Sequence, residues 1–195
     1  LQKEDPAKPN HVLLDVNVDK KEKVKVNSLV FEDNQVLSYH QLNRAMKKTN
    51  AKGKIRNFFR TKKFVKDKYE EDLVALIDRY NEDGYRDARI ISESVTRNDN
   101  NTVDVHIKVE EGIKYYFGNI TWVGNSIYPG DQLSAYLKID KGDVFNNKQL
   151  DKRLFSDEDA VHNVYMDNGY LFSSISPIET YVHGDTIDLE MRVME

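Results

Sequence analysis

A six-residue phrase occurs twice in this chain and constrains its fold more than any other feature. The phrase is Tyr-Asn-Glu-Asp-Gly-Tyr over 80–85 and Tyr-Met-Asp-Asn-Gly-Tyr over 165–170. Each copy follows a stretch of helical apolar spacing and precedes an extended stretch. Gly84 and Gly169 stand where a helix end needs a left-handed residue, a conformation that glycine adopts at little cost. The phrase therefore predicts the same helix-to-strand transition twice, and with it a duplicated architecture.

Other parts of the chain support two copies of one unit. The alternating stretch 103–109 has a counterpart at 187–193. Five further positions recur 91 residues later, namely Leu29, Phe31, Asn34, Leu42 and Met46, which match Ile120, Trp122, Asn125, Leu133 and Leu137. The repeat distance of the phrase is 85 residues, so loop lengths differ while the order of elements is kept.

Each unit is predicted to contain a strand, two helices and two strands, in that order. The first unit is expected to have a strand at 24–31, a helix capped by Ser38, a helix from Lys66 to the phrase, and strands at 88–92 and 103–109. The second is expected to have a strand at 115–123, a helix capped by Asp131, a helix over 150–165, and a hairpin of 171–180 and 186–193. A three-stranded sheet with one apolar face needs a cover, which two helices can supply, so the fold class is α+β.

The expected boundaries follow from this duplication. Residues 24–112 form one unit and residues 113–195 the next, with the boundary near Gly112-Ile113. Residues 1–23 are interpreted as a linker over 1–10, with two prolines, followed by a strand over 12–19, the last strand of a truncated preceding unit. Because the chain opens with Leu1 and shows no signal peptide, we expect a fragment of a longer protein.

No catalytic, metal or cofactor motif stands out. The chain has no cysteine, which excludes disulfides and thiolate metal sites. Its five histidines are scattered without ligand spacing, at His11, His40, His106, His162 and His183. Nucleophile-elbow, P-loop and dinucleotide motifs are absent from the sequence, so we expect no enzyme. The acidic triplet 157–159 is interpreted as the first turn of a helix rather than a cation site.

Charge is distributed unevenly. Residues 113–195 hold seven basic residues against thirteen acids, whereas 44–68 holds eleven basic residues and one acid. This run is either a solvated face or a surface for an anionic partner or anionic lipid headgroups. The predicted basic surface consists of Lys47, Lys48, Lys52, Lys54, Arg56, Arg60, Lys62 and Lys63.

The order and spacing of several short motifs resemble the POTRA (polypeptide-transport-associated) repeat of the outer-membrane β-barrel assembly protein family. The resemblance covers roughly 24–195. It rests on Gly118-Asn119-Ile120, Gly124-Asn125, Leu133 with Leu137, Gly142 with Phe145, Tyr165 with Gly169-Tyr170, and the unit boundary Val109-Glu110-Glu111-Gly112. The stretches 151–159 and 167–172 look most like the versions found in the Bacteroidetes.

The resemblance implies tandem βααββ units at the periplasmic face of the bacterial outer membrane, followed by a membrane barrel of the same polypeptide. It implies binding of unfolded outer-membrane β-barrel proteins and of accessory assembly subunits. The implied strand order is first, third, second, which leaves each second strand on an edge where an extended peptide can add by β-augmentation. The predicted edge residues are Ala88, Arg89, Ile90, Ile91 and Ser92 in the first unit and Phe172, Ser173, Ser174, Ile175 and Ser176 in the second.

Two alternatives remain open at this stage. The chain could be the POTRA region of another transporter, in two-partner secretion, or of a division protein. It could also be a KH-like nucleic-acid module, which has a related order of elements. A KH domain needs a Gly-x-x-Gly clamp, which the sequence lacks, and the second unit is acidic, so we expect no nucleic-acid partner.

Overall fold

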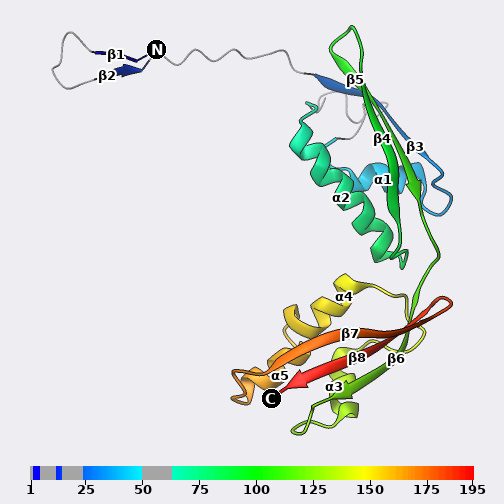
Figure 1. Cartoon of the computed structure of the whole chain (residues 1–195), viewed down its shortest axis with the longest axis vertical. Coiled ribbons are helices and arrows are strands. Elements are labelled where there is room, and N and C mark those ends of the chain that lie inside the picture. The colour runs from blue at the N-terminus through cyan, green and yellow to red at the C-terminus, as the bar shows by residue number, and fades with distance from the viewer. Residues whose placement is uncertain (1, 5–11, 15–23, 50–62) are drawn as a thin grey trace.

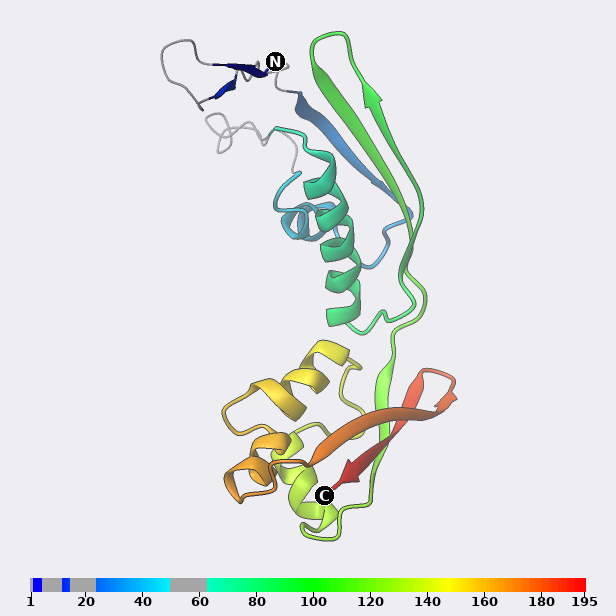
Figure 2. The same ribbon diagram turned by 60° about the vertical axis from the view of Figure 1, so that its left-hand side comes forward.

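The computed structural model describes residues 2–4, 12–14, 24–49 and 63–195. Within 24–195 it has two α+β units placed end to end, each with a three-stranded mixed sheet (Figure 1). In both views the helices of a unit lie on the same side of its sheet (Figure 2). The predicted fold class is confirmed, and the strands that the structure describes form no continuous sheet through the two units.

The first unit follows the predicted order of elements. Its bounds are β3 (Lys25–Glu32), α1 (Tyr39–Ala45), α2 (Lys66–Glu82), β4 (Arg89–Arg97) and β5 (Thr102–Glu110). The sheet order is β3-β5-β4, with β3 parallel and β4 antiparallel to the central β5, which confirms the expected order. Every second residue of β5 is buried against the helices, as its alternating sequence predicts.

The second unit repeats this topology with a different helical layer. Its bounds are β6 (Tyr116–Val123), α3 (Gly130–Leu137), α4 (Asn147–Asp151), the π-helical turn η1 (Lys152–Ser156), α5 (Val161–Asp167), β7 (Ser174–His183) and β8 (Thr186–Met194). The sheet order is β6-β8-β7, again with the third strand in the centre. Trp122 packs against the core, and its indole N–H donates to Ser134 Oγ at 2.9 Å.

The prediction of one continuous second helix is wrong for this unit. The helix is interrupted between η1 and α5, where Asp157 adopts an extended conformation. Arg153 explains the interruption, because its guanidinium donates to Asp157 at 2.8 Å and to Asp159 at 2.7 Å. It also donates to the carbonyls of Tyr136 and Leu137 at the end of α3. The acidic triplet therefore lies in the break, and its two aspartates bind Arg153, instead of forming a simple first helical turn.

The two predicted helix caps have different outcomes. Ser38 is the N-cap of α1, and its backbone N–H donates to Gln41 Oε1 at 3.0 Å. The Asp131 cap is wrong, because α3 begins at Gly130 after Pro129, and Asp131 lies inside the first turn. Proline suits this position because a helix start leaves backbone N–H groups without partners in any case.

The N-terminal linker interpretation also needs correction. Gln2–Glu4 forms a short strand, β1, which pairs antiparallel with β2 (Val12–Leu14). The strand predicted from residue 12 is therefore present over 12–14, and its backbone is paired with the chain's own N-terminus. The rest of that predicted strand, 15–19, lies outside the described residues.

A carboxylate that was not predicted closes each unit. Glu111 follows β5 and accepts the backbone N–H groups of Gln35 and Val36 at 2.9–3.1 Å. It also accepts the hydroxyl of the buried phrase residue Tyr80, at 2.9 Å. Glu195 does the same after β8, accepting from Ser126, Ile127 and Tyr165. The phrase tyrosines are therefore tied to the residue that ends each sheet.

Candidate functional site

The free edge of the first unit is β4, because β5 covers only one of its sides. The backbone N–H of Asn98 donates to the carbonyl of Thr102 at 2.9 Å, which makes these residues a hydrogen-bonded pair. Hydrogen-bonded pairs alternate with non-bonded pairs in an antiparallel ladder. Counting back along the register, the residues whose N–H and C=O groups point away from β5 are Glu93, Val95 and Arg97.

This geometry shifts the predicted edge toward the C-terminal half of the strand. Arg89, Ile90, Ile91 and Ser92 lie in β4, but Ala88 precedes it and is buried. The ladder is irregular at Ile91, where the register shifts. Ser92 belongs to the set that faces β5. The regular outward-facing part is therefore 93–97, beyond the predicted residues.

The side chains of β4 are exposed on both faces, apart from the partly buried Ile90. Val95 is 39% exposed and Ile91 48%, so apolar surface is available beside the free backbone groups. Tyr69 of α2 holds the strand against the helix, since its hydroxyl donates to Glu93 at 2.6 Å. Burial, and then this hydrogen bond, raise the pKa of Tyr69 far above its ordinary value, so it stays a donor.

The second unit offers a less regular edge, β7. Ser174, Ile175 and Ser176 lie in this strand as predicted. Phe172 and Ser173 precede it, Phe172 exposed and Ser173 buried. The strand continues through Pro177, which has no N–H to donate. Because β7 lacks a main-chain donor at Pro177, β4 is the better candidate of the two.

The predicted basic surface is only partly visible. Lys52, Lys54, Arg56, Arg60 and Lys62 lie outside the described residues. Lys47 and Lys63 are exposed. Lys48 is in an ion pair with Glu71, and its backbone N–H donates to Asp72 at 2.8 Å. The hypothesis of an anion-binding surface stays a prediction for the remaining residues.

A joint between the units was not predicted from the sequence. Arg86, just after the first phrase, donates to Glu179 of β7 at 2.7 Å. Its guanidinium carbon also lies 5.5 Å from the ring centroid of Tyr115 and 6.0 Å from that of Phe145. Tyr115 in turn donates its hydroxyl to Asp87 at 2.6 Å and its backbone N–H to Gly84. Arg86 and Asp87 lie between the phrase and the strand predicted at 88–92, and their partners lie about 30 to 90 residues further along the chain, so no local pattern indicated their contact.

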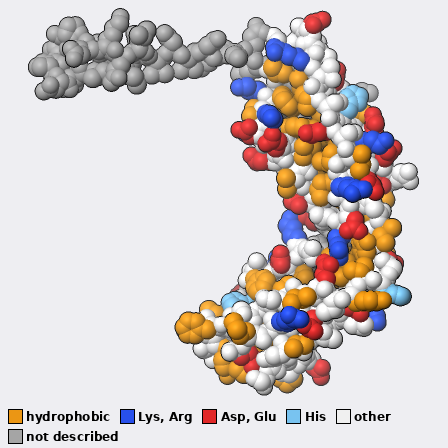
Figure 3. Space-filling model, in the orientation of Figure 1, with side chains coloured by type: hydrophobic (Ala, Val, Ile, Leu, Met, Phe, Trp, Pro, Cys, Tyr) orange, Lys and Arg blue, Asp and Glu red, His pale blue; other side chains and the backbone are white. Residues whose placement is uncertain are grey.

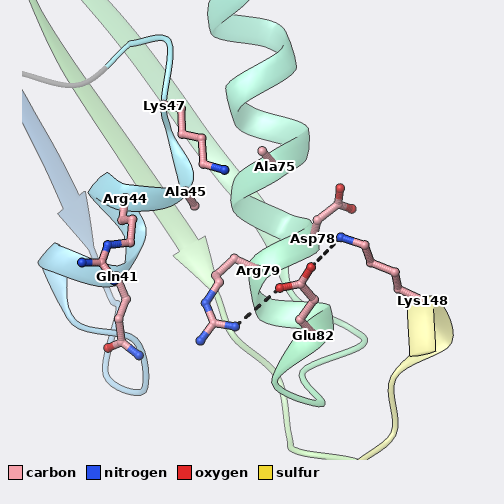
Figure 4. A pocket seen from close by; sticks show the side chains of 9 residues that line it. All are labelled: Gln41, Arg44, Ala45, Lys47, Ala75, Asp78, Arg79, Glu82 and Lys148. Carbon is pink, nitrogen blue, oxygen red and sulfur yellow. Dashed lines mark hydrogen bonds and ion pairs between the residues drawn. The ribbon is translucent and has the colours of Figure 1, made fainter. Parts of the chain in front are cut away.

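A hollow beside this joint brings α1, α2 and α4 together, with a volume of about 570 Å³. Figure 4 shows Glu82 between two cations, with ion pairs to Lys148 at 2.7 Å and Arg79 at 3.7 Å. The hydrogen bond to Glu82 raises the pKa of Lys148. Asn146 donates to the backbone carbonyl of Glu82, so the end of α2 is bound by the second unit through both main chain and side chain. Glu82 is therefore used as a structural contact.

Two negative findings apply to the described part of the chain. It contains no group of three or more histidine, aspartate or glutamate side chains placed to hold a metal ion. None of its helices has the length and apolar character needed to cross a membrane.

These features define a class of protein: tandem three-stranded modules with a free strand edge, joined by specific contacts. The family model of POTRA, described as "Surface antigen variable number repeat", matches residues 24–112 and 115–195. The chain belongs to the POTRA family, as the sequence resemblance indicated.

Two curated relatives and one solved structure illustrate the likeness. The chain is 28% identical over 169 residues to "Outer membrane protein assembly factor BamA" of Neisseria meningitidis, covering 86% of this chain and 21% of that protein. It is 24% identical to "Putative outer membrane protein assembly factor" of Treponema pallidum, covering 91% of this chain and 20% of that protein. The crystal structure of Haemophilus influenzae BamA POTRA3-5 superposes with a TM-score of 0.61 at 23% identity, over 89% of this chain and 66% of that one. The chain thus spans about a fifth of the length of these curated relatives.

Proposed function

We propose that this chain is the periplasmic POTRA region of an outer-membrane protein assembly factor and binds unfolded outer-membrane β-barrel proteins as extended segments. The names of the two curated relatives support the assembly role. The chain would act as a scaffold and receptor, without catalysis. Accessory assembly subunits, and an anionic membrane surface at the basic run, are further partners in this proposal.

The observation that carries the proposal is the free edge of β4. Glu93, Val95 and Arg97 direct main-chain donors and acceptors away from the sheet, and the edge has no proline over its nine residues. Main-chain pairing does not depend on the client's side chains, which suits a receptor for many clients. Each hydrogen bond contributes about 1 kcal/mol net. A single edge therefore binds weakly, and several units in series gain by avidity.

The test uses the chain with isotopically labelled amides and peptides from membrane strands of barrel proteins. We expect chemical-shift changes along β4 and along the neighbouring β5. Val95→Pro removes one outward N–H and should weaken binding severalfold. Val95→Thr is the matched control, because it keeps the N–H and a similar shape. Circular dichroism would check that both variants keep the fold.

Two outcomes would contradict the proposal. One is a set of shift changes confined to the helices while β4 does not respond. The other is equal peptide affinity for the Val95→Pro and Val95→Thr variants. The alternative of a transporter with one dedicated client makes a different prediction, namely that peptides from unrelated barrels fail to compete with the client's own peptide.

A further inference from the structure

The loop between α5 and β7 exposes two large apolar side chains in succession. Leu171 is 61% exposed and Phe172 93%. In Figure 3, hydrophobic side chains project from the side of the lower unit where Figure 1 places this loop. Isolated exposed apolar residues are common on protein surfaces, but an adjacent pair this exposed calls for an explanation.

The same loop is present in the first unit, with the same backbone geometry. Gly84 and Gly169 have φ angles of +93° and +90°. In each copy the tyrosine after the glycine donates its N–H to the first tyrosine of the phrase, at 3.0 Å. A second hydrogen bond closes each loop. The N–H of Ala88 donates to the carbonyl of Tyr85 at 3.2 Å, and the N–H of Ser173 donates to that of Tyr170 at 3.1 Å. Arg86 and Asp87 therefore occupy the positions of Leu171 and Phe172.

In the first unit this loop is covered by the unit that follows it in the chain. Arg86 and Asp87 make the contacts to Tyr115, Phe145 and Glu179 described above. A Cβ atom on Gly84 would lie 2.7 Å from the side chain of Val144, whereas one on Gly169 would meet nothing within 4 Å. The loop is thus a docking site that is filled in the first copy and bare in the second.

We propose that the Leu171–Phe172 loop is the docking site for the domain that follows Glu195 in the full-length polypeptide. In the first unit, this loop is covered by the next domain of the same chain. The polypeptide that leads to that domain leaves the sheet beside the loop that the domain covers. In the second unit the chain also leaves the sheet beside this loop, since Met194 at the end of β8 pairs with Ser174 at the start of β7. The curated relatives are about five times as long as this chain, which leaves polypeptide to fill the site.

The chemistry of the two loops specifies different occupants. Arg86 and Asp87 require aromatic faces, a carboxylate and a hydroxyl, all of which the second unit supplies. Leu171 and Phe172 offer no charge and no side-chain hydrogen bond. Met194 is 65% exposed and pairs with Ser174, two residues after Phe172, so a third apolar side chain is exposed at the same end of the sheet. The occupant's contact surface is therefore apolar, and it differs from the surface that covers Gly84–Asp87.

The first test places the photo-crosslinking amino acid p-benzoylphenylalanine at Phe172 in the full-length protein. We expect intrachain crosslinks from position 172 to residues beyond Glu195, identified by mass spectrometry. The matched control is the same amino acid at Tyr181, which is 61% exposed on β7 of the same unit. It should give no such crosslink. Crosslinks to a second copy, to another protein or to lipid, or no adduct at all, would each overturn the proposal.

The second test measures limited proteolysis just beyond Glu195 in the full-length protein. Leu171→Ser with Phe172→Ser should raise the cleavage rate severalfold, because the following domain loses its apolar contact. Tyr181→Ser should leave the rate unchanged. Equal rates in the double variant and the unmodified protein would overturn the proposal. Neither test involves a client, so failure here leaves the β4 proposal standing, and failure of the β4 proposal leaves this one standing.

Discussion

At the scale of single residues, Glu111 and Glu195 show how much one carboxylate can organise. Glu111 accepts two backbone N–H groups from the turn after β3 and the hydroxyl of Tyr80. Burial alone would raise the pKa of Glu195, but its hydrogen bonds from Ser126, Ile127 and Tyr165 lower that pKa overall. The sequence placed Glu111 at a unit boundary without showing what it binds, because its partners lie about 30 and 75 residues away.

We predict that Glu111→Gln destabilises the first unit by about 1–3 kcal/mol, since the amides of Gln35 and Val36 and the hydroxyl of Tyr80 lose a charged acceptor. The neighbouring Glu110→Gln is the control. Glu110 is exposed and forms an ion pair with exposed Arg89, so its loss should cost about 1 kcal/mol or less. Native-state hydrogen exchange of β5 amides measures the stability of this unit separately. Equal effects of the two substitutions would contradict a specific stabilising role for the hydrogen bonds of Glu111.

At the scale of elements, strands and their order were predictable, and the helical layer of the second unit was not. Alternation along 103–109 and 187–193 marked the two central strands, because burial on one face imposes a period of two. The break after η1 has no such period. It depends on Arg153 meeting Asp157, Asp159 and the end of α3, which are tertiary contacts. The outward-facing amides of β4 could likewise be identified only from the register of β4 with β5.

The Arg153 cluster predicts a pH dependence for the second unit. Its hydrogen bonds hold the pKa values of Asp157 and Asp159 below their ordinary values. A carboxylate with a lowered folded-state pKa stabilises the fold above its unfolded-state pKa and loses that effect as the pH falls through the folded-state value. Thermal stability should therefore decrease below about pH 4, where unfolded carboxylates begin to bind protons.

Removing the guanidinium should remove this dependence. Arg153→Gln should lower the melting temperature by several degrees at neutral pH and flatten its decrease on acidification. Arg192→Gln is the matched control, because Arg192 is exposed and pairs with Glu190 on the surface. Thermal melts at a series of pH values compare the three proteins. If the melting temperature of the Arg153→Gln variant decreased on acidification as steeply as that of the unmodified protein, other carboxylates would control the acid response.

At the scale of the whole molecule, the duplication was predictable and the joint was not. Internal repeats show that two units exist, but the contacts between them involve residues that differ between the copies. Arg86 and Asp87 have Leu171 and Phe172 as counterparts, so the repeat itself hid their function. The joint combines an ion pair, two ring contacts, a hydroxyl bond and the contacts of Glu82 with Asn146 and Lys148.

This joint predicts a defined angle between the units. Each partly exposed contact contributes about 1 kcal/mol or less. Arg86→Ala removes the ion pair and both ring contacts together, so it should broaden the distribution of angles between the units. The chain has no cysteine, and nitroxide labels at Ser94→Cys and Tyr181→Cys report the distance between units by pulsed electron resonance. We expect a narrow distribution for the unmodified joint and a broader one for Arg86→Ala.

Two further variants separate a specific joint from a general loss of charge. Arg89→Ala removes an exposed ion pair inside the first unit and should leave the distribution narrow. Arg86→Glu combined with Glu179→Arg keeps the ion pair but places the cation on the other unit, away from its present position over Tyr115 and Phe145. If this double variant only partly restored the narrow distance distribution, the remaining broadening would be assigned to the lost contacts with the two rings. A broad distribution in the unmodified protein would mean that these contacts do not fix the angle.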